Sequence, residues 1–260
     1  MSLPAPDANN HETVVEHQFG PRAAAYLTSA VHAQGEDLNQ LVAIARTRPA
    51  ARLLDLGCGG GHVGFSVAPH VAEVVAYDLS AAMLDQVAQA ARQRGLGNLT
   101  TRRGAAEQLP FEDQSFDLVF SRYSAHHWQD VPAALREARR VLRPTGRLVI
   151  DDVVAPERPL LDTHLQAFEL LRDPSHVRNY SVSQWQALLS TAGFEPDGVM
   201  RRRLFLDFAS WVERMQTAAV HVAAIRSLQI EVSAEVKAHF DIQADGSFTI
   251  DTAVVEASPH

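Results

Sequence analysis

The feature that most constrains the fold of this chain is a glycine-rich turn at residues 53–62, Leu-Leu-Asp-Leu-Gly-Cys-Gly-Gly-Gly-His. A short apolar run that breaks into clustered glycines is typical of a buried strand entering a tight turn before a helix. Glycine permits positive φ and lets a ligand lie against the backbone. Tyr77-Asp78 ends the next apolar run. An acid about twenty residues after such a turn is placed to hold ribose hydroxyls. Together these features predict a cofactor that contains a nucleoside.

The glycines leave two interpretations of that cofactor open. Gly59, Gly61 and Gly64 match the dinucleotide pattern G-x-G-x-x-G, as in NAD(P)-dependent oxidoreductases. Asp55 favours the other interpretation. It precedes the turn, where a carboxylate would repel a diphosphate but attract an ammonium group. S-adenosylmethionine has a ribose, an amino group and no phosphate, so Asp55 favours this methyl donor.

Strands and helices alternate along the first 154 residues. Strands are expected at 51–56, 73–78, 99–103, 116–121 and 147–154, with helices at 36–46, from 81 to Gly95, and at 130–142. This alternation indicates right-handed crossovers and a parallel sheet. A helix at 183–192, a sixth strand after Gly193 and a last strand at 248–255 follow.

One α/β domain accommodates the 260 residues. Residues 1–10 are polar and are expected to form a disordered tail, and residues 11–154 to hold the N-terminal segment and cofactor-binding core. Residues 155–260 would complete the same domain. Within them, the helix-prone segments at about 155–182 and 207–246 are expected to be insertions that cap the cofactor site.

Composition narrows the class of protein. A formal charge of −8 argues against a nucleic-acid partner, because phosphate contacts demand a basic face. The sequence shows no secretion signal and no apolar run near the ~20 residues that span a bilayer. The single cysteine, Cys58, excludes a disulfide framework and a cysteine-rich zinc site. We therefore expect a cytoplasmic enzyme that acts on a small molecule and needs no metal. The sequence carries no signal for an oligomeric state.

Several motifs together carry a family resemblance. Residues 55–59, Asp-Leu-Gly-Cys-Gly, resemble motif I of class I S-adenosylmethionine-dependent methyltransferases, in the subgroup similar to ubiquinone/menaquinone-type C-methyltransferases (methyltransferase type 11). The similarity continues, in the family's order, at 74–80, 83–84, 104–111, 116–122 and 135–150. Residues 172–180 and 211–215 resemble one bacterial branch whose members mostly lack assigned substrates. The resemblance implies a Rossmann-like, seven-stranded, mostly parallel sheet with an antiparallel last strand and helices on both faces. It implies S-adenosylmethionine as the donor and S-adenosylhomocysteine as the product.

The resemblance also implies a set of cofactor contacts. Gly57 and Gly59 would let the cofactor pass, Asp78 would bind its ribose, and Tyr26 would bind its carboxylate. The family often has an acid where this chain has Ala105, so backbone groups or Glu107 would recognise the adenine. The full expected set is Tyr26, Asp55, Gly57, Cys58, Gly59, Asp78, Leu79, Met83, Ala105, Ala106, Glu107 and Ser121.

The candidate catalytic residues are histidines. His126 and His127 follow the fourth strand, and either could remove a proton from the acceptor, with His126 preferred. One of them could instead cap the next helix or pack against Trp128. His176 is a third candidate. Arginine forks suit a carboxylate, phosphate or phenolate, although solvated arginines on helices are common. The expected substrate contacts are Arg122, Tyr123, Arg178, Tyr180 and Arg214.

These observations predict a methyltransferase that acts by in-line transfer on a small aromatic or anionic metabolite. The acceptor is unidentified, and methylation of carbon, oxygen or nitrogen stays open. Two alternatives stay open as well: an NAD(P)-dependent oxidoreductase, and a non-catalytic cofactor-binding regulatory subunit.

Overall fold

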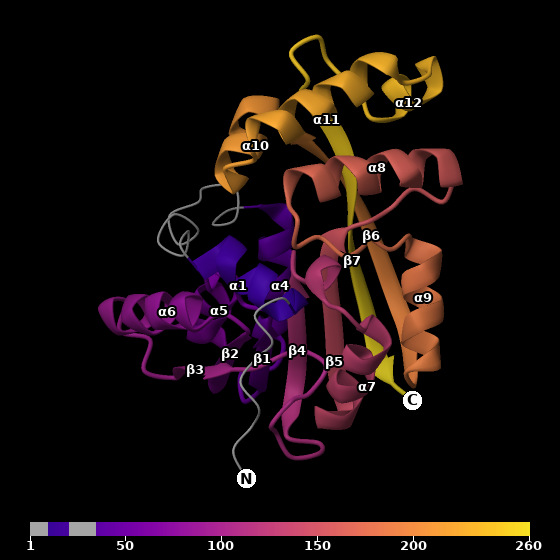
Figure 1. Cartoon of the computed structure of the whole chain (residues 1–260). Helices are drawn as coiled ribbons and strands as arrows, with labels where there is room; N and C mark the ends of the chain where they lie inside the picture. Colours follow the sequence, from indigo (N-terminus) through magenta and orange to yellow (C-terminus); the bar gives the residue numbers. More distant parts are fainter. Residues whose placement is uncertain (1–9, 21–34) are drawn as a thin grey trace.

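The fold is a seven-stranded sheet in the order β3-β2-β1-β4-β5-β7-β6, seen in a computed structural model that describes residues 10–20 and 35–260 (Figure 1). The strands are β1 (Arg52–Leu56), β2 (Glu73–Asp78), β3 (Leu99–Arg103), β4 (Phe116–Arg122), β5 (Leu142–Val153), β6 (Phe194–Leu206) and β7 (Phe248–Pro259). β1 to β5 pair in parallel, and β7 lies antiparallel between β5 and β6. The predicted Rossmann-like sheet is confirmed. Its strand order reverses between β1 and β4, where ligands of such sheets bind.

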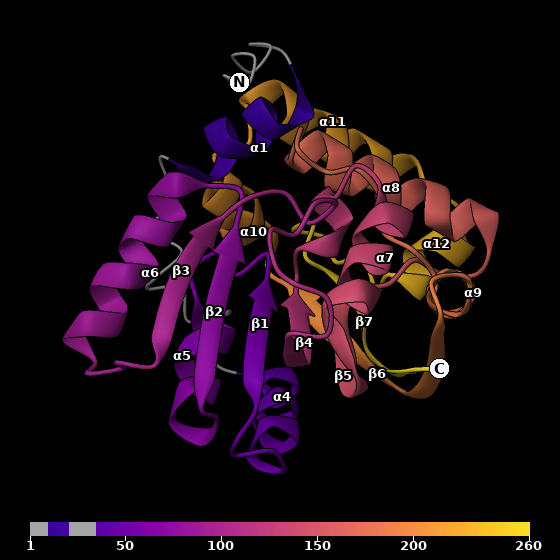
Figure 2. The ribbon, with the colours of Figure 1, turned by 90° about the horizontal axis from the view of Figure 1, so that it is seen from below.

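Helices cover both faces of this sheet. α4 (Glu36–Arg46), α5 (His62–Val67) and α6 (Ala81–Gln93) pack on one face. α7 (Val131–Val141) and α9 (Val182–Thr191) pack on the other. Side chains alternate between the faces along a strand, so Leu53 joins the first core and Leu54 the second. Figure 2 shows the two groups of helices on either side of the strands.

Local capping signals fix several helix starts. The Ser80 hydroxyl accepts a hydrogen bond from the Met83 backbone N–H at 3.3 Å, which begins α6 as predicted. Ser181 and Gln184 form a capping box at the start of α9. Asn10 caps α1 (His11–Phe19), so the prediction of a disordered tail is wrong for this residue. The rest of that tail, residues 1–9, lies outside the described residues.

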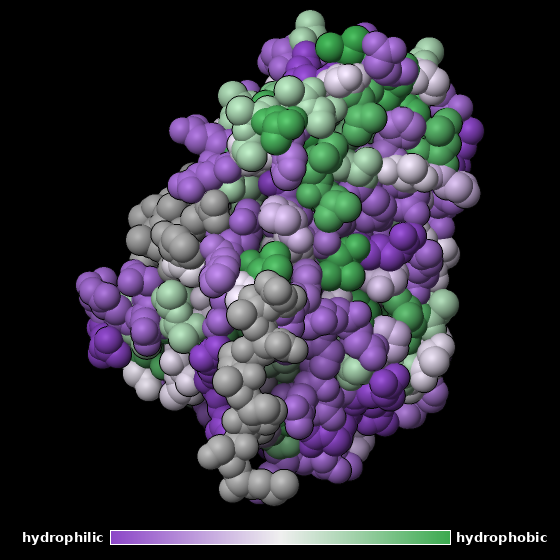
Figure 3. Space-filling view, viewed as in Figure 1, coloured by the Kyte–Doolittle hydropathy of each residue, from purple (hydrophilic) through white to green (hydrophobic). Residues whose placement is uncertain are grey.

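A third layer of helices stands above one end of the sheet. It consists of α8 (Pro159–Arg172), α10 (Phe208–Met215), α11 (Ala219–Glu231) and α12 (Ala234–His239) (Figure 1). These helices share a core with the adjoining ends of β6 and β7, in which Phe168 and Trp211 pack edge-on against Phe248. We call α8 and α10–α12 the helical cap. Exposed apolar side chains gather over this part of the surface in Figure 3.

Tertiary pairing extends two strands, β5 and β7, beyond the segments that the sequence predicts, and it sets the end of β6, which the sequence did not predict. β5 begins at Leu142 rather than Arg147, because Leu142 pairs with Phe116 before a register shift. β6 and β7 pair continuously from Phe194 opposite Pro259 to Leu206 opposite Phe248, apart from one irregularity after Pro196. No helix in the described part of the chain is long and apolar enough to cross a membrane.

Candidate active site

The glycine turn forms the floor of a cleft at the carboxyl ends of β1 and β2. Gly57, Gly59 and Gly61 have φ of +73°, +47° and +76°. A Cβ at Gly57 would lie 1.8 Å from the Ser124 hydroxyl, so the turn also needs glycine for close packing. A Cβ at Gly59 would meet nothing within 4 Å. Because Gly59 lines the cleft, that open space belongs to the cleft itself.

This cofactor cleft comprises about 1090 Å³ of space, open solvent included. Most of the expected cofactor residues line it: Asp55, Gly57, Cys58, Gly59, Asp78, Leu79, Met83, Ala105, Ala106 and Glu107. Helix α1 adds His11, Glu12, Val15 and Phe19 to the lining. Phe19 also belongs to the N-terminal segment that, by its family resemblance, was expected to close over the methionine end of the cofactor.

Two carboxylates in the cleft organise the turn. Asp55 Oδ2 accepts a hydrogen bond from the Gly64 backbone N–H at 2.9 Å. Burial, aided by the charge of Asp78, raises the pKa of Asp55 to about 7. Asp78 accepts hydrogen bonds from the Gly59 and Ser80 backbone N–H groups at 2.8 and 2.9 Å. Burial raises the pKa of Asp78 as well. Each carboxylate oxygen has two lone pairs, so both acids retain capacity for a ligand.

Three of the expected cofactor contacts, Glu107, Ser121 and Tyr26, differ from the others in what the structure shows. The Glu107 carboxylate accepts hydrogen bonds from the Gln129 and Asp130 backbone N–H groups at 2.9 and 3.2 Å, so this acid also holds the loop before α7. Ser121 is buried in β4 and lies outside the cleft lining, which Arg122 and Tyr123 reach instead. Tyr26 lies outside the described residues.

A second cavity of about 730 Å³, open solvent included, adjoins the cofactor cleft beneath the helical cap. Phe19, Tyr123 and His127 line both spaces. The remaining lining residues come from the loops after β4 and α8, from the cap and from β5 to β7: His126, Val153, Glu169, Arg172, Asp173, His176, Asn179, Leu204, Leu206, Trp211, Arg214, Met215 and Ile250. The predicted insertions therefore cover this second cavity.

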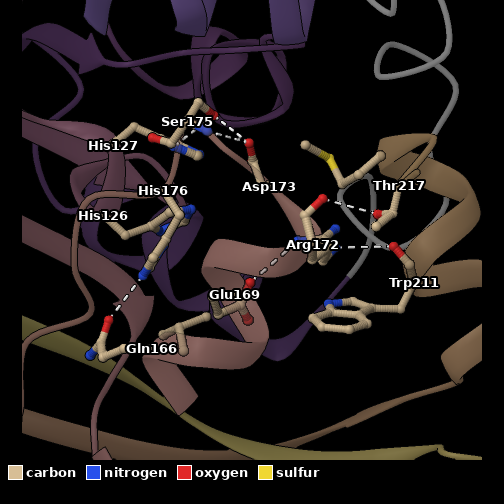
Figure 4. Close-up of polar contacts among 12 residues, drawn as sticks. His126, His127, Gln166, Glu169, Arg172, Asp173, Ser175, His176, Trp211 and Thr217 are labelled. Carbon is tan, nitrogen blue, oxygen red and sulfur yellow. Dashed lines mark hydrogen bonds and ion pairs between the residues drawn. The ribbon is translucent and has the colours of Figure 1, made fainter. Parts of the chain in front are cut away.

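Three histidines stand together in the second cavity (Figure 4). The ring centroid of His126 lies 4.2 Å from that of His127 and 5.8 Å from that of His176. Burial lowers the pKa of His127 to about 4 and that of His176 to about 2. Burial also acts to lower the pKa of His126, but the carboxylates of Asp152, Glu169 and Asp173 outweigh it and raise that pKa. Of these three histidines, only His126 therefore has a raised pKa.

Comparison with known proteins gives this geometry a family. Residues 54–150 match the family model described as a methyltransferase domain. The chain is 52% identical over 201 residues to the uncharacterized protein YafE of Escherichia coli, covering 77% of this chain and 97% of YafE. It is 39% identical over 204 residues to the uncharacterized methyltransferase YcgJ of Bacillus subtilis, covering 78% of this chain and 81% of YcgJ. This chain belongs to the class I S-adenosylmethionine-dependent methyltransferases.

The crystal structure of YcgJ extends the likeness to three dimensions. It superposes with a TM-score of 0.82 at 33% identity and covers 86% of this methyltransferase and 98% of YcgJ. A further relative is the 2-phytyl-1,4-naphtoquinone methyltransferase of Synechococcus elongatus. It is 33% identical over 178 residues, which are 65% of this chain and 73% of that protein.

Two residues of this methyltransferase that were expected to bind substrate, Arg178 and Tyr180, have other partners. Arg178 pairs with Asp162 at 2.8 Å and lies outside both lining sets. Tyr180 packs edge-on against Trp185, with ring centroids 5.5 Å apart, and is also outside them. The structure thus does not bring these two residues to the site.

The three other expected substrate contacts do line the site, and Tyr123 lines both spaces. Arg122 lines the cofactor cleft, but its guanidinium is buried and pairs with Asp37 at 2.6 Å and with Asp151 at 3.4 Å. Arg214 lines the second cavity. We infer that Arg122 mainly holds the cleft wall, because its charge is already met by acids.

Two further polar residues line the second cavity, Arg172 and Glu169, and the sequence did not predict a role for Glu169. The Arg172 Nε donates to the Trp211 carbonyl at 3.0 Å, and its guanidinium lies 4.8 Å from the Trp211 ring centroid (Figure 4). The buried Glu169 lies one turn before Arg172, with an N–O distance of 3.5 Å. Nothing in the local sequence marks Glu169, since its role depends on where α8 packs. Among residues 10–20 and 35–260, no group of three or more histidine, cysteine or acidic side chains is placed to hold a metal ion.

Proposed function

We propose that this protein transfers a methyl group from S-adenosylmethionine to a small-molecule acceptor, with the donor in the cofactor cleft and the acceptor in the second cavity. The observation that carries the proposal is the junction of the two spaces. Phe19, Tyr123 and His127 line both, so two ligands can meet there. In-line transfer requires this alignment of donor and acceptor.

The residues of the cleft fit the donor. The positive-φ Gly59 leaves room for a ligand against the backbone, which a side chain would fill. The buried Asp55 carboxylate would hold the ammonium group, and Asp78 the ribose hydroxyls. The buried side chain of Met83 offers an apolar surface to the adenine. When bound, S-adenosylmethionine supplies an electrophilic methyl group.

The second cavity suits a flat, largely apolar acceptor. Trp211, Phe19 and Tyr123 supply aromatic surface, and Leu204 and Ile250 add aliphatic surface. The relative that acts on a naphthoquinone supports a ring-shaped acceptor.

Calorimetric titration tests the donor assignment. S-adenosylhomocysteine should bind the wild-type protein, and Asp78→Ala should weaken that binding by at least tenfold. Arg178→Ala is a matched control, because its side chain does not line the cofactor cleft, and it should bind as the wild type does. Binding of NADH without binding of S-adenosylhomocysteine would refute the proposal and favour an oxidoreductase.

A second measurement tests turnover. Labelled S-adenosylmethionine is incubated with the protein and a cell extract of small metabolites, and the labelled product is isolated. Incorporation of label supports an enzyme and identifies the acceptor. Tight binding of S-adenosylhomocysteine without any incorporation would favour the non-catalytic subunit.

A further inference from the structure

Resting on the proposed function, we propose that the acceptor carries a hydroxyl group conjugated to a ring, as in a phenol or an enol. Asp152 is the positioning residue that orients His126 to remove the proton of that hydroxyl. Neither this pairing nor the acceptor class follows from the cofactor cleft. Both come from the polar wall of the second cavity.

The contact between Asp152 and His126 is short and buried. Asp152 Oδ1 lies 2.6 Å from His126 Nδ1, and the exposed fractions of the two side chains are 2% and 17%. The same carboxylate accepts hydrogen bonds from the Val153 N–H at 2.8 Å and from the His126 backbone N–H at 3.3 Å. Three contacts from β5 and the loop after β4 therefore fix the acid and the ring together.

This arrangement selects one tautomer of His126. A carboxylate can only accept, so Nδ1 carries the hydrogen and Nε2 has the free lone pair. His126 lines the second cavity, and Nε2 has no hydrogen-bond partner among the described residues. The loop after α8 holds the backbone here, since the Val177 N–H donates to the His126 carbonyl at 2.8 Å. The basic nitrogen is thus left for a ligand in the cavity.

The surrounding charges let His126 accept a proton. Asp152 from β5 and Glu169 and Asp173 from the end of α8 face it and stabilise the imidazolium. The neighbouring rings of His127 and His176 are neutral near pH 7, because burial lowers their pKa values. A proton taken from the acceptor therefore stays on His126.

The acidity of hydroxyl groups indicates that the acceptor group that loses this proton is a ring-conjugated hydroxyl. An aromatic hydroxyl has a pKa of about 10, as in tyrosine, which is close enough to imidazole for transfer. An aliphatic alcohol is a far weaker acid. The aromatic side chains Trp211, Phe19 and Tyr123 also favour a flat ring.

Asn179 supplies a second polar contact for such a ring. It lines the cavity, is 1% exposed, and neither atom of its side-chain amide has a hydrogen-bond partner in the described chain. A buried, unsatisfied amide is costly, so a ligand that bonds to it gains free energy. A carbonyl or second hydroxyl on the acceptor ring would complete this contact.

The step balances without a further reactant. The acceptor oxygen forms a bond to the methyl carbon while the bond from that carbon to the sulfonium sulfur breaks. The electron pair of the broken bond stays on sulfur, and the hydroxyl proton moves to His126 Nε2. The products are a methyl ether, S-adenosylhomocysteine and a protonated His126.

Histidine NMR of the full-length protein tests the positioning role. In the wild type, the ¹⁵N shifts should show His126 protonated on Nδ1, with a pKa above the ordinary value of about 6.5. Asp152→Asn should lower that pKa below the ordinary value, because burial then dominates. Asp151→Asn is the matched control on the same strand and should leave the His126 titration unchanged. Thermal unfolding of each variant shows that the fold is retained.

An unchanged His126 titration in a folded Asp152→Asn protein would overturn the positioning role. This result is distinguishable from failure of the proposed function, which would appear as loss of S-adenosylhomocysteine binding in the wild type. If Asp152→Asn does not fold, Asp152→Glu keeps the carboxylate and should retain the raised pKa. A lowered pKa in that variant would also count against the assignment.

A paired ligand panel tests the acceptor class. Phenols such as 1-naphthol, whose hydroxyl keeps its proton at neutral pH, are compared with analogues in which an amino group replaces the hydroxyl, in the presence of S-adenosylmethionine. Mass spectrometry should find methyl ethers only from the hydroxyl compounds, and His126→Gln should reduce their formation at least 100-fold. Products methylated on nitrogen or carbon, or no reaction with any hydroxyl compound, would overturn the proposal.

Discussion

The sharpest prediction concerns two glycines of one turn that should respond differently to the same substitution. At Gly59, alanine adds only the strain of a left-handed backbone, about 1–2 kcal/mol, because its Cβ meets nothing within 4 Å. At Gly57, the added Cβ would also lie 2.6 Å from Ser124 Cβ, which no rotation of the hydroxyl relieves. Overpacking of this kind costs about 1–3 kcal/mol more, so Gly57→Ala should destabilise by about 2–5 kcal/mol.

The loss of S-adenosylhomocysteine binding should follow the opposite order and be larger at Gly59. The space beside Gly59 is the cofactor cleft, so Gly59→Ala should weaken S-adenosylhomocysteine at least tenfold while the protein stays folded. Urea unfolding measures the loss of stability, and calorimetric titration measures the loss of affinity. Both use the full chain. Equal losses of stability in the two variants would refute the packing argument. Wild-type affinity in Gly59→Ala would show that the ligand does not pass this glycine.

Three further substitutions test other parts of the site. Burial raises the pKa of folded Asp55 from 3.8 to about 7, so the folded state binds more protons and wild-type stability falls as pH rises between these values. Urea unfolding at several pH values should show no such fall for Asp55→Asn. A free energy of unfolding that falls with pH equally in the wild type and in Asp55→Asn would contradict this prediction. Asn179→Leu should keep or raise the free energy of unfolding, by up to about 3 kcal/mol, because it removes an unsatisfied amide, yet abolish binding of the phenol panel. A clear loss of stability would show that the amide is satisfied. Arg178→Ala should cost less than about 1 kcal/mol and leave methyl transfer unchanged, since its pair with Asp162 is partly exposed. A large rise in the KM for the acceptor would return Arg178 to the site.

Local sequence signals predicted the sheet and the cofactor cleft well. The glycine turn, the acid at Asp78 and the cap at Ser80 each depend on neighbours a few residues away, so their roles can be recognised in the chain. The same locality explains the errors at strand ends. β6 and β7 are long because they pair with each other, and nothing in either segment alone states how far that pairing runs.

The acceptor side could be predicted only in part. The sequence drew attention to His126, His127 and His176, and the structure brings all three together in the second cavity. It also predicted substrate contacts at Arg178 and Tyr180, whose side chains turn to Asp162 and Trp185 instead. An arginine in the sequence shows that a positive charge is present. It does not show which acid will pair with that charge, because the acid comes from another turn or helix.

The sequence by itself determined that this chain carries a nucleoside site, since a strand, a glycine turn and an acid after the next strand suffice to define one. The tertiary structure alone decided how the second cavity works. Asp152 reaches His126 across 26 positions, and Glu169 and Asn179 face the same space only because α8 and the loop after it fold over β5. Burial lowers the pKa of all three histidines, and only the carboxylates packed around His126 reverse that effect there, which is a property of the packed chain.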